Sequence, residues 1–484
     1  MKYLYCVWCA VALINCSLEC FRILQNTSYR PQRGYAKIVF SWYYLVLILA
    51  AAVSWIWQVY FRLEVVLCGF YTLLAIPLVL VKHKTPLKFT KRIWRMLAVE
   101  FALLLVACYF ALHWWIAFLP IFALVAYAFC LPADLMIARV YFKRAQSKLF
   151  ASNVTVIAIT GSYGKTSTKD MLASLLSDSI APKGSCNTPL GIAAYINATD
   201  LSRHKFLILE FGARKKGDIA QLCHIYKPKF GIITGVCEQH LSTFRNLQNI
   251  LSTKGELAEN LPSDGLCLLG DASVCKLLEV GACKKQYADV TICNLRISPN
   301  GIDFDATLGN KTSLVHLPQI TAYSAGTFAL CATMCNHLGQ NFDETVKNAQ
   351  FVRQTPHRME ISHNGAFYII DDSYNGSVRG VEGCVELLAQ LSGIKVAICQ
   401  GIVECGNDRK KLNEWCGESL GGVCDVVIVL GKNSQMLKLG AQKAGCKVVL
   451  EAKNLQNAVQ LAQSYLVRDS FLLFQNDLPD VVYF

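Results

Sequence analysis

The residues best suited to chemistry form a glycine-rich loop between a predicted strand and a predicted helix. The β-branched apolar run 154–160 has the pattern of a buried strand, and the stretch up to about residue 176 has that of a helix. Between them lie glycines at 161 and 164, followed by Lys165 and Thr166. Glycines let backbone N–H groups turn toward an anion, and the helix start adds partial positive charge. The pattern predicts a phosphate-binding loop, in which Lys165 reaches the β- and γ-phosphates of a nucleotide and Thr166 binds Mg²⁺. The alternative is a glycine turn with an incidental lysine.

Three further side chains of suitable chemistry follow predicted strands or lie on a predicted helix. Glu210 ends the apolar strand 207–210, a suitable place for a carboxylate ligand of Mg²⁺, although a helix cap or a solvent-facing glutamate would have the same pattern. His240 follows a third strand at 230–234, and a lone histidine is more often structural than a ligand. The sequence around Lys254 predicts only an amphipathic helix and by itself indicates no function for this lysine.

Two adjacent aspartates mark a second candidate site nearer the C-terminus. The run 366–370 predicts a strand that ends in Asp371 and Asp372. A turn or a helix cap uses the same residue types, so both interpretations stay open. The region also has the alternating strands and helices of a doubly wound α/β domain, with later strands at 395–399, 425–430 and 470–474.

The loop at 160–166 resembles that of the Mur ligases, the ATP-dependent enzymes that add amino acids to the peptidoglycan stem. Ile159 stands where the commonest phosphate-binding loop has another glycine. Further motifs follow in the family's order and cover about residues 151–484, with the member that adds D-alanyl-D-alanine the most similar. These motifs are Asn187-Thr-Pro-Leu-Gly191, Leu207 to Ala213, Lys227-Pro228, Thr234, His240-Leu241, Lys254-Gly255-Glu256, Arg358-Met359-Glu360, Asp371 to Asn375 and Gly401 to Gly406.

The resemblance implies a set of site residues. The catalytic residues would be Lys165, Glu210, His240 and Lys254, and Asn187 and Thr188 would lie in the substrate-side loop. The residues implied to bind ATP are Thr160, Gly161, Ser162, Gly164, Lys165, Thr166, Ser167, Arg358, Asp371 and Asp372, with one of the two aspartates on the ribose. The residues implied to hold Mg²⁺ are Thr166, Glu210, His240 and Lys254. In the family the last of these is carbamylated, a reaction that needs a neutral amine and that nearby magnesium would favour.

The implied reaction joins an acceptor carboxylate to an amine. Transfer of the γ-phosphoryl group of ATP gives an acyl phosphate that the amine displaces, so the site must neutralise charge and position the reactants. Three departures concern the substrates: the family's UDP-sugar-binding N-terminal domain is absent, Leu269 stands about where an adenine-contacting Asn is expected, and 474–480 replaces a Lys-Gly-Ser element. The acceptor, small-molecule or lipid-linked, and the amine, an amino acid or a dipeptide, therefore stay open.

The first third of the chain has the composition of a membrane region. Hydrophobic residues make up 54% of the whole chain and charged residues 17%, which is too apolar for an ordinary cytosolic enzyme. Residues 1–150 hold 16 Lys and Arg against 4 Asp and Glu, so most of the net charge of +13 arises there. This placement favours membrane lipid rather than nucleic acid as a partner. The apolar runs predict about five spans, near 3–21, 38–61, 65–81, 96–115 and 116–136.

The connectors between these runs predict the orientation. Those at 22–37 and 82–95 are basic and lack acidic residues, so the positive-inside rule places them in the cytoplasm. The N-terminus would then lie outside and the catalytic domains inside, as in a multi-pass protein of a bacterial-type inner membrane. A cleaved signal peptide is the alternative for the first run. Glu100, within the fourth run, is a functional candidate as an intramembrane charge, but we expect it to snorkel to the interface.

We therefore predict a transmembrane helical region at 1–148, an ATP-binding α/β domain of the phosphate-loop type at 149–350 and a Rossmann-like α/β domain at 351–484. The 22 cysteines lack metal-ligand spacing and favour free thiols in a reducing compartment. Two other functional classes remain. One is a membrane-anchored scaffold with a ligase-derived fold. The other is a nucleotide-driven transporter, which the sequence supports less, because transporter spans normally carry more charged residues than Glu100 alone.

Overall fold

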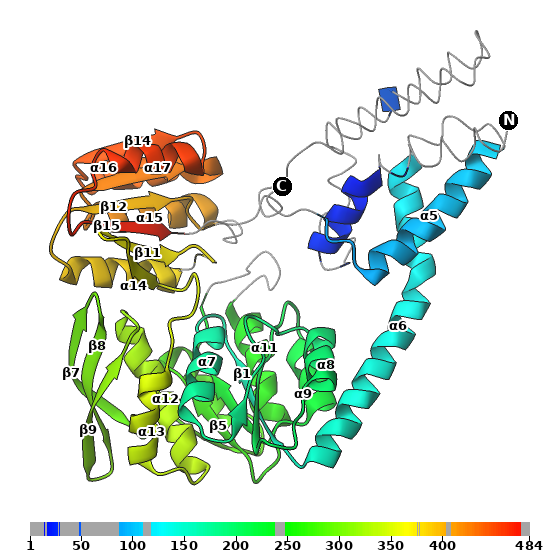
Figure 1. Ribbon diagram of the computed structural model, residues 1–484, viewed down its shortest axis with the longest axis horizontal. Coiled ribbons are helices and arrows are strands. Elements are labelled where there is room, and N and C mark those ends of the chain that lie inside the picture. The colour runs from blue at the N-terminus through cyan, green and yellow to red at the C-terminus, as the bar shows by residue number, and fades with distance from the viewer. Residues whose placement is uncertain are drawn as a thin grey trace. The chain divides into compact units, whose positions relative to one another are not determined.

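Two compact units make up the computed structural model, which describes residues 14, 17–27, 29, 48–49, 87–109, 118–237, 247–374, 376, 378–402 and 408–475 (Figure 1). The first unit takes in residues 1–140 and 479–484, and the second takes in residues 141–478. This division does not test the predicted domain boundaries at 148 and 350, which stay predictions.

Two long helices begin in the first unit and overlap the fourth and fifth predicted spans: α5 (Lys91–Tyr109) and α6 (Leu119–Ser152). Among the described residues, α6 is the one helix long and apolar enough to cross a bilayer. Core helices of soluble proteins can have the same length and composition. The first three predicted spans lie mostly outside the described residues. A transmembrane region of several helices therefore stays a prediction.

Polar side chains inside the first unit contact one another. The hydroxyl of Ser17 donates a hydrogen bond of 2.9 Å to the carboxylate of Glu100, which is fully buried. Arg92 and Arg95 on α5 both pair with Asp134 on α6. The expectation that Glu100 snorkels to an interface is wrong, because its side chain is buried against Ser17.

A six-stranded parallel sheet forms the centre of the second unit's N-terminal half, in the order β2-β3-β1-β4-β5-β6 (Figure 1). Side chains alternate along its central strands between two apolar clusters, with Ala158 and Leu209 in one and Ile157 and Ile208 in the other. Parallel strands covered on both faces have such continuous apolar runs, which is why they could be predicted. The strands are β1 (Thr155–Thr160), β2 (Ser179–Ile180), β3 (Phe206–Glu210), β4 (Phe230–Ile233), β5 (Leu266–Leu269) and β6 (Lys284–Gln286), and the helices are α7 (Lys165–Leu175), α8 (Pro189–Ala198), α9 (Asp218–Tyr226), α11 (Leu247–Asn260) and the 3₁₀ helix η3 (Ala272–Glu279).

A three-stranded antiparallel sheet and two helices complete this half. They are β7 (Thr291–Ser298), β8 (Gly301–Leu308), β9 (Lys311–Leu317), α12 (Ala322–His337) and α13 (Phe342–Asn348), followed by the 3₁₀ turn η4 (Ala349–Phe351). The rings of Phe304 on β8 and Phe328 on α12 meet edge to face, with centroids 5.4 Å apart. Because α12 also packs against α7, it brings Tyr323 to the glycine-rich loop.

The C-terminal half contains a second six-stranded sheet, in the order β10-β11-β15-β12-β13-β14, in which β10 alone is antiparallel (Figure 1). The strands are β10 (Glu360–His363), β11 (Tyr368–Asp372), β12 (Lys395–Cys399), β13 (Val426–Leu430), β14 (Val448–Ala452) and β15 (Phe471–Gln475), and the helices are α14 (Val378–Gln390), α15 (Arg409–Gly421), α16 (Ser434–Lys443), α17 (Leu455–Gln463) and the 3₁₀ turn η6 (Gly431–Asn433). The predicted Rossmann-like alternation of strands and helices is confirmed.

The described cysteines form no disulfides, as predicted. Most are buried, while Cys275 and Cys293 are exposed. Burial raises the pKa of the thiols of Cys267, Cys331 and Cys384 well above the ordinary value. These side chains therefore behave as small apolar groups of the core.

Candidate active site

The glycine-rich loop joins the end of β1 to the start of α7, as predicted. Gly161 and Gly164 have φ angles of +150° and +70°, which side chains rarely adopt. A β-carbon at Gly161 would collide with the hydroxyl of Thr234, and one at Gly164 with the hydroxyl of Tyr323. Both glycines are therefore needed for close approach as well as for the turn.

Lys165 curls back over this loop. Its Nζ donates to the carbonyl oxygen of Gly161 at 2.9 Å and to that of Ser162 at 3.3 Å. Burial lowers the pKa of Lys165, and the carboxylate of Glu210 opposes this shift. The ammonium thus lies inside the curve of a loop whose backbone N–H groups and helix start suit a phosphate.

Three predicted residues from three different segments meet at the carboxylate of Glu210, which ends β3 and is 1% exposed. The hydroxyl of Thr166 on α7 donates to its Oε2 at 2.8 Å, and the side-chain amide of Asn187 donates to its Oε1 at 2.9 Å. Ser185 lies 3.5 Å from the Thr166 hydroxyl. A carboxylate and a hydroxyl beside a phosphate loop are hard oxygen donors, so Thr166 and Glu210 fit a Mg²⁺ ion.

A buried lysine that the sequence reasoning did not single out positions the loop carrying Asn187. Lys169, one helical turn after Lys165, is fully buried, and its Nζ donates to the carbonyl oxygens of Pro182 and Gly184 at 2.7 and 2.5 Å. Its spacing of four residues from Lys165 was the one available indication, since it places both lysines on one face of the helix.

The remaining predicted residues of the loop region have structural contacts. The hydroxyl of Thr160 donates to the carbonyl oxygen of Phe211 at 2.9 Å. Thr188 is the N-cap of α8 and accepts a bond from the backbone N–H of Gly191. Ser162 donates to the carbonyl oxygen of Cys237 at 3.5 Å. Ser167 lines the cavity described below.

Lys254 is buried on α11 and shares its electrostatic surroundings with the phosphate loop. Its pKa is lowered to about 7, first by burial and then by the charge of Lys165, while Asp218, Glu256 and Glu210 act in the opposite direction. A large share of the amine is therefore neutral near pH 7, the state that carbamylation requires. The predicted partner His240 lies outside the described residues.

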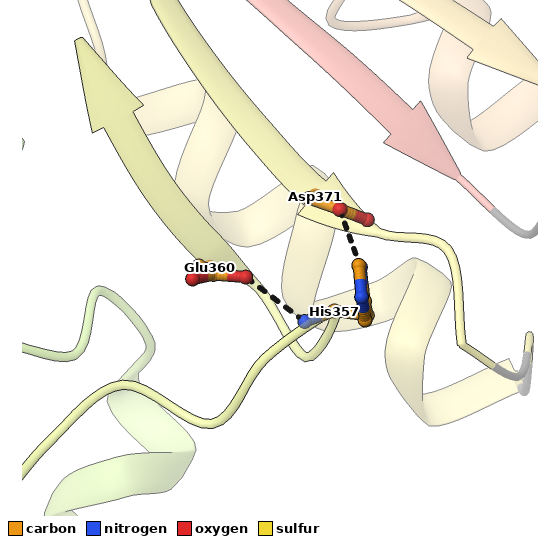
Figure 2. A group of neighbouring side chains, drawn as sticks. All are labelled: His357, Glu360 and Asp371. Atoms are coloured by element: carbon orange, nitrogen blue, oxygen red, sulfur yellow. Dashed lines mark hydrogen bonds and ion pairs between the residues drawn. The ribbon is translucent and has the colours of Figure 1, made fainter.

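The two aspartates at the end of β11 have different surroundings. The Nδ1 atom of His357 lies 2.7 Å from Asp371, and the backbone N–H of His357 donates to Glu360 at 3.1 Å (Figure 2). Burial opposes ionisation of Asp371, but hydrogen bonds from Ser373 and His357 outweigh it and lower its pKa. One ring nitrogen of His357 and one carboxylate oxygen each of Glu360 and Asp371 lie within 4.8 Å of one another. The carboxylate of Asp371 is therefore held by its neighbours His357 and Ser373.

Asp372 instead lines a cavity of about 200 Å³. Burial raises its pKa to about 7, although the charge of Arg358 opposes this shift. His357 and Met359, which flank Arg358, have φ angles of +58° and +51°, an unusual conformation that is typical of functional sites. Of the two aspartates, Asp372 is the one placed to meet a ligand in the cavity.

The cavity is lined by the phosphate loop, the start of α12 and the C-terminal half of the unit. Its walls include Tyr163 and Gly164 of the loop, Tyr323 of α12, and Arg358. Leu269, in place of the expected Asn, is fully buried in the core and offers no polar group. Of the altered element 474–480, residues 476–480 lie outside the described residues.

Comparison with known families identifies the half that carries the loop. Residues 159–293 match the family model described as the Mur ligase middle domain. The chain carries a Mur ligase middle domain. Its predicted resemblance to this family is thereby confirmed, and the match contains Lys165, Thr166, Glu210 and Lys254.

Relatives and solved structures extend the likeness of this chain beyond that domain. It is 24% identical over 299 residues to the UDP-N-acetylmuramoyl-tripeptide–D-alanyl-D-alanine ligase of Escherichia coli (strain K12), an alignment covering 58% of this chain and 66% of the relative. The crystal structure of MurF from Acinetobacter baumannii has a TM-score of 0.63 at 23% identity, covering 71% of this chain and 77% of that one. The MurF ligase of Thermotoga maritima in complex with ADP has a TM-score of 0.62 at 22% identity, covering 70% and 80%.

The relatives and the solved structures match different shares of the chain. The structural neighbours share the fold over about 70% of this chain, which is more than the Mur ligase middle domain spans. The chain spans less than two thirds of the length of the E. coli relative.

Proposed function

We propose that this protein is an ATP- and Mg²⁺-dependent ligase that joins an acceptor carboxylate to an amino acid or dipeptide. The observation that carries the proposal is the meeting of Thr166, Asn187 and Glu210 beside Lys165, at the carboxyl ends of two parallel strands. Relatives named as ligases that use a UDP-N-acetylmuramoyl tripeptide and D-alanyl-D-alanine support cell-wall precursor synthesis as its process.

Different residues of the chain would bind the phosphates, the rest of the nucleotide and the metal ion. Lys165 would neutralise the β- and γ-phosphates, and Asp372 and Arg358 would hold the rest of the nucleotide from the cavity. Glu210 and Thr166 would hold Mg²⁺, whose charge favours transfer of the γ-phosphoryl group to the acceptor carboxylate. Asn187 keeps the Glu210 carboxylate oriented through its hydrogen bond of 2.9 Å.

We further propose that the ligase is a multi-pass membrane protein with its catalytic domains in the cytoplasm, acting on a lipid-linked acceptor. The five apolar runs, the basic connectors and the apolar helix α6 support this proposal. Turnover should be compared between a lipid-linked acceptor and its soluble counterpart. Equal use of the soluble acceptor would contradict the lipid-linked part, and release of the full chain from membranes by alkaline carbonate would contradict the spans.

Release of ADP and phosphate by the purified full-length chain tests the ligase. Release should require both the acceptor and the amine, and Lys165→Ala should abolish it. Lys410→Ala, at an exposed position of α15, is the matched control and should retain full turnover. Unchanged turnover in Lys165→Ala would refute the mechanism.

A non-catalytic scaffold with a ligase-derived fold is the second candidate, because Leu269 offers no polar contact to a base. It predicts no product with any acceptor or amine. Calorimetry separates the two further, because the ligase should bind ATP with Mg²⁺ and Lys165→Ala should not.

A further inference from the structure

The side chain of Tyr374, in the C-terminal half, forms a hydrogen bond to the loop that carries Asn187. Its hydroxyl donates to the hydroxyl of Ser185 at 3.0 Å. Tyr374 comes two residues after Asp372, just beyond the end of β11. The contact therefore links the end of the second sheet to the substrate-side loop of the first.

On the central side, this contact continues to the candidate metal site. Ser185 lies 3.5 Å from the hydroxyl of Thr166, which donates to Glu210 at 2.8 Å. The loop holding Ser185 is fixed by the buried Lys169, which binds the carbonyl oxygen of Gly184 next to it. Movement of Ser185 would thus alter the surroundings of Thr166, the residue of the first turn of α7 that is proposed to bind Mg²⁺.

On the C-terminal side, the ring of Tyr374 contacts Arg358, a cationic residue of the cavity wall. The guanidinium carbon of Arg358 lies 4.2 Å from the centre of the Tyr374 ring, within the range of a cation–π contact. Arg358 and Asp372 both line the cavity. The ring of Tyr374 therefore contacts Arg358, which the proposed reaction assigns to the nucleotide, and its hydroxyl contacts Ser185, the neighbour of the proposed metal ligand Thr166.

Burial does not account for this placement. Tyr374 is 47% exposed, so apolar packing does not fix its ring. An exposed tyrosine is held in one orientation only where specific contacts hold it, and here its side chain contacts Arg358 and Ser185. A purely structural tyrosine would instead be expected to have a buried ring, as Tyr226 does at 1% exposed.

We propose that Tyr374 is a positioning residue that couples Arg358 in the nucleotide cavity to the Ser185–Thr166–Glu210 metal site. The proposal rests on the proposed ligase function. With its ring under Arg358 and its hydroxyl on Ser185, Tyr374 makes the correct placement of one group depend on the other. It takes no part in bond making or breaking.

Two substitutions and their combination test the coupling in the full-length chain. Tyr374→Phe removes the hydroxyl and keeps the ring, and Ser185→Ala removes its acceptor. Each should lower kcat about tenfold, the order expected for one lost hydrogen bond in a site, and should raise the Mg²⁺ concentration needed for half-maximal turnover. Because both break the same contact, the double variant should be no slower than either single variant. Tyr287→Phe, at an exposed tyrosine of the central half, is the control and should leave kcat unchanged.

A binding measurement separates failure of this coupling from failure of the proposed function. Without Mg²⁺, Tyr374→Phe should bind ADP like the wild type, because the contact with Arg358 remains, whereas Tyr374→Ala should bind it more weakly. With Mg²⁺, the affinity of Tyr374→Phe for ADP should fall. A wild-type chain that binds ADP but never turns over would refute the ligase and leave the coupling to be decided by these affinities. Additive effects in the double variant, or unchanged kcat and Mg²⁺-dependent affinity in Tyr374→Phe, would overturn the coupling.

Discussion

The two neighbouring aspartates at the end of β11 should respond to pH in opposite ways. Burial raises the pKa of Asp372 from the ordinary 3.8 to about 7, so the folded protein takes up a proton there more readily than the unfolded chain. Stability should therefore fall as pH rises from about 4 to 7, at about 1.4 kcal/mol per pH unit. The difference between the two pKa values amounts to about 4 kcal/mol at pH 7 and above. Asparagine resembles the neutral carboxyl group and removes this penalty.

We expect Asp372→Asn to be little different from the wild type near pH 4 and to gain stability over it up to pH 7. The gain should then stay constant at higher pH. Asp371→Asn is the matched control, because the pKa of Asp371 is lowered and its ionised form is stabilised by Ser373 and His357. Its contribution is present above pH 4 and lost as pH falls, so Asp371→Asn should destabilise the protein at pH 7.

Thermal and urea unfolding of the full-length variants, from pH 4 to 8, would measure both effects. The comparison of each variant with the wild type at the same pH cancels the titration of groups that do not contact the substituted residue. A stability difference for Asp372→Asn that stays flat, or that shrinks as pH rises, would refute the reasoning from burial.

Three further outcomes concern the central half. Lys169→Met should leave the carbonyl oxygens of the loop 182–184 without their donor and weaken Mg²⁺ activation about tenfold, as measured by turnover against Mg²⁺ concentration. Gly164→Ala should abolish ATP binding in calorimetry, because a β-carbon there meets Tyr323 at a φ of +70°; retained binding would contradict the collision. Lys254, with a pKa of about 7, should show a ¹³C carbamate resonance with labelled bicarbonate at pH 8 and a much weaker one at pH 6, and Lys254→Arg should show none.

Much of the second unit could be predicted because its strands are continuous apolar runs that end in polar residues. The run 154–160 and the strand ending in Glu210 were placed within one residue of β1 and β3. The family resemblance implies that Thr166 and Glu210 bind Mg²⁺ and that Asn187 lies in the substrate-side loop, and hydrogen bonds join the three side chains. Parallel sheets gather the carboxyl ends of their strands at one edge, so residues far apart in sequence meet there.

Contacts that depend on tertiary packing were beyond this reasoning. The role of Lys169 comes from its complete burial against a loop 13 residues away, which no local pattern reveals. Which aspartate faces the cavity could not be predicted, because it depends on His357. This residue has an unusual positive φ angle and contacts Asp371, not Asp372. Glu100 was misjudged because its partner, Ser17, lies 83 positions earlier.

The uneven exposure of the thiols has a practical use. A maleimide dye reacts with the thiolate, and burial keeps most of the described cysteines both protonated and out of reach. Among the described residues, Cys275 and Cys293 should therefore be labelled first, and both belong to the central half. A fluorophore placed there would mark the central half in preference to the C-terminal sheet, whose described thiols are buried or, at Cys446, half-buried.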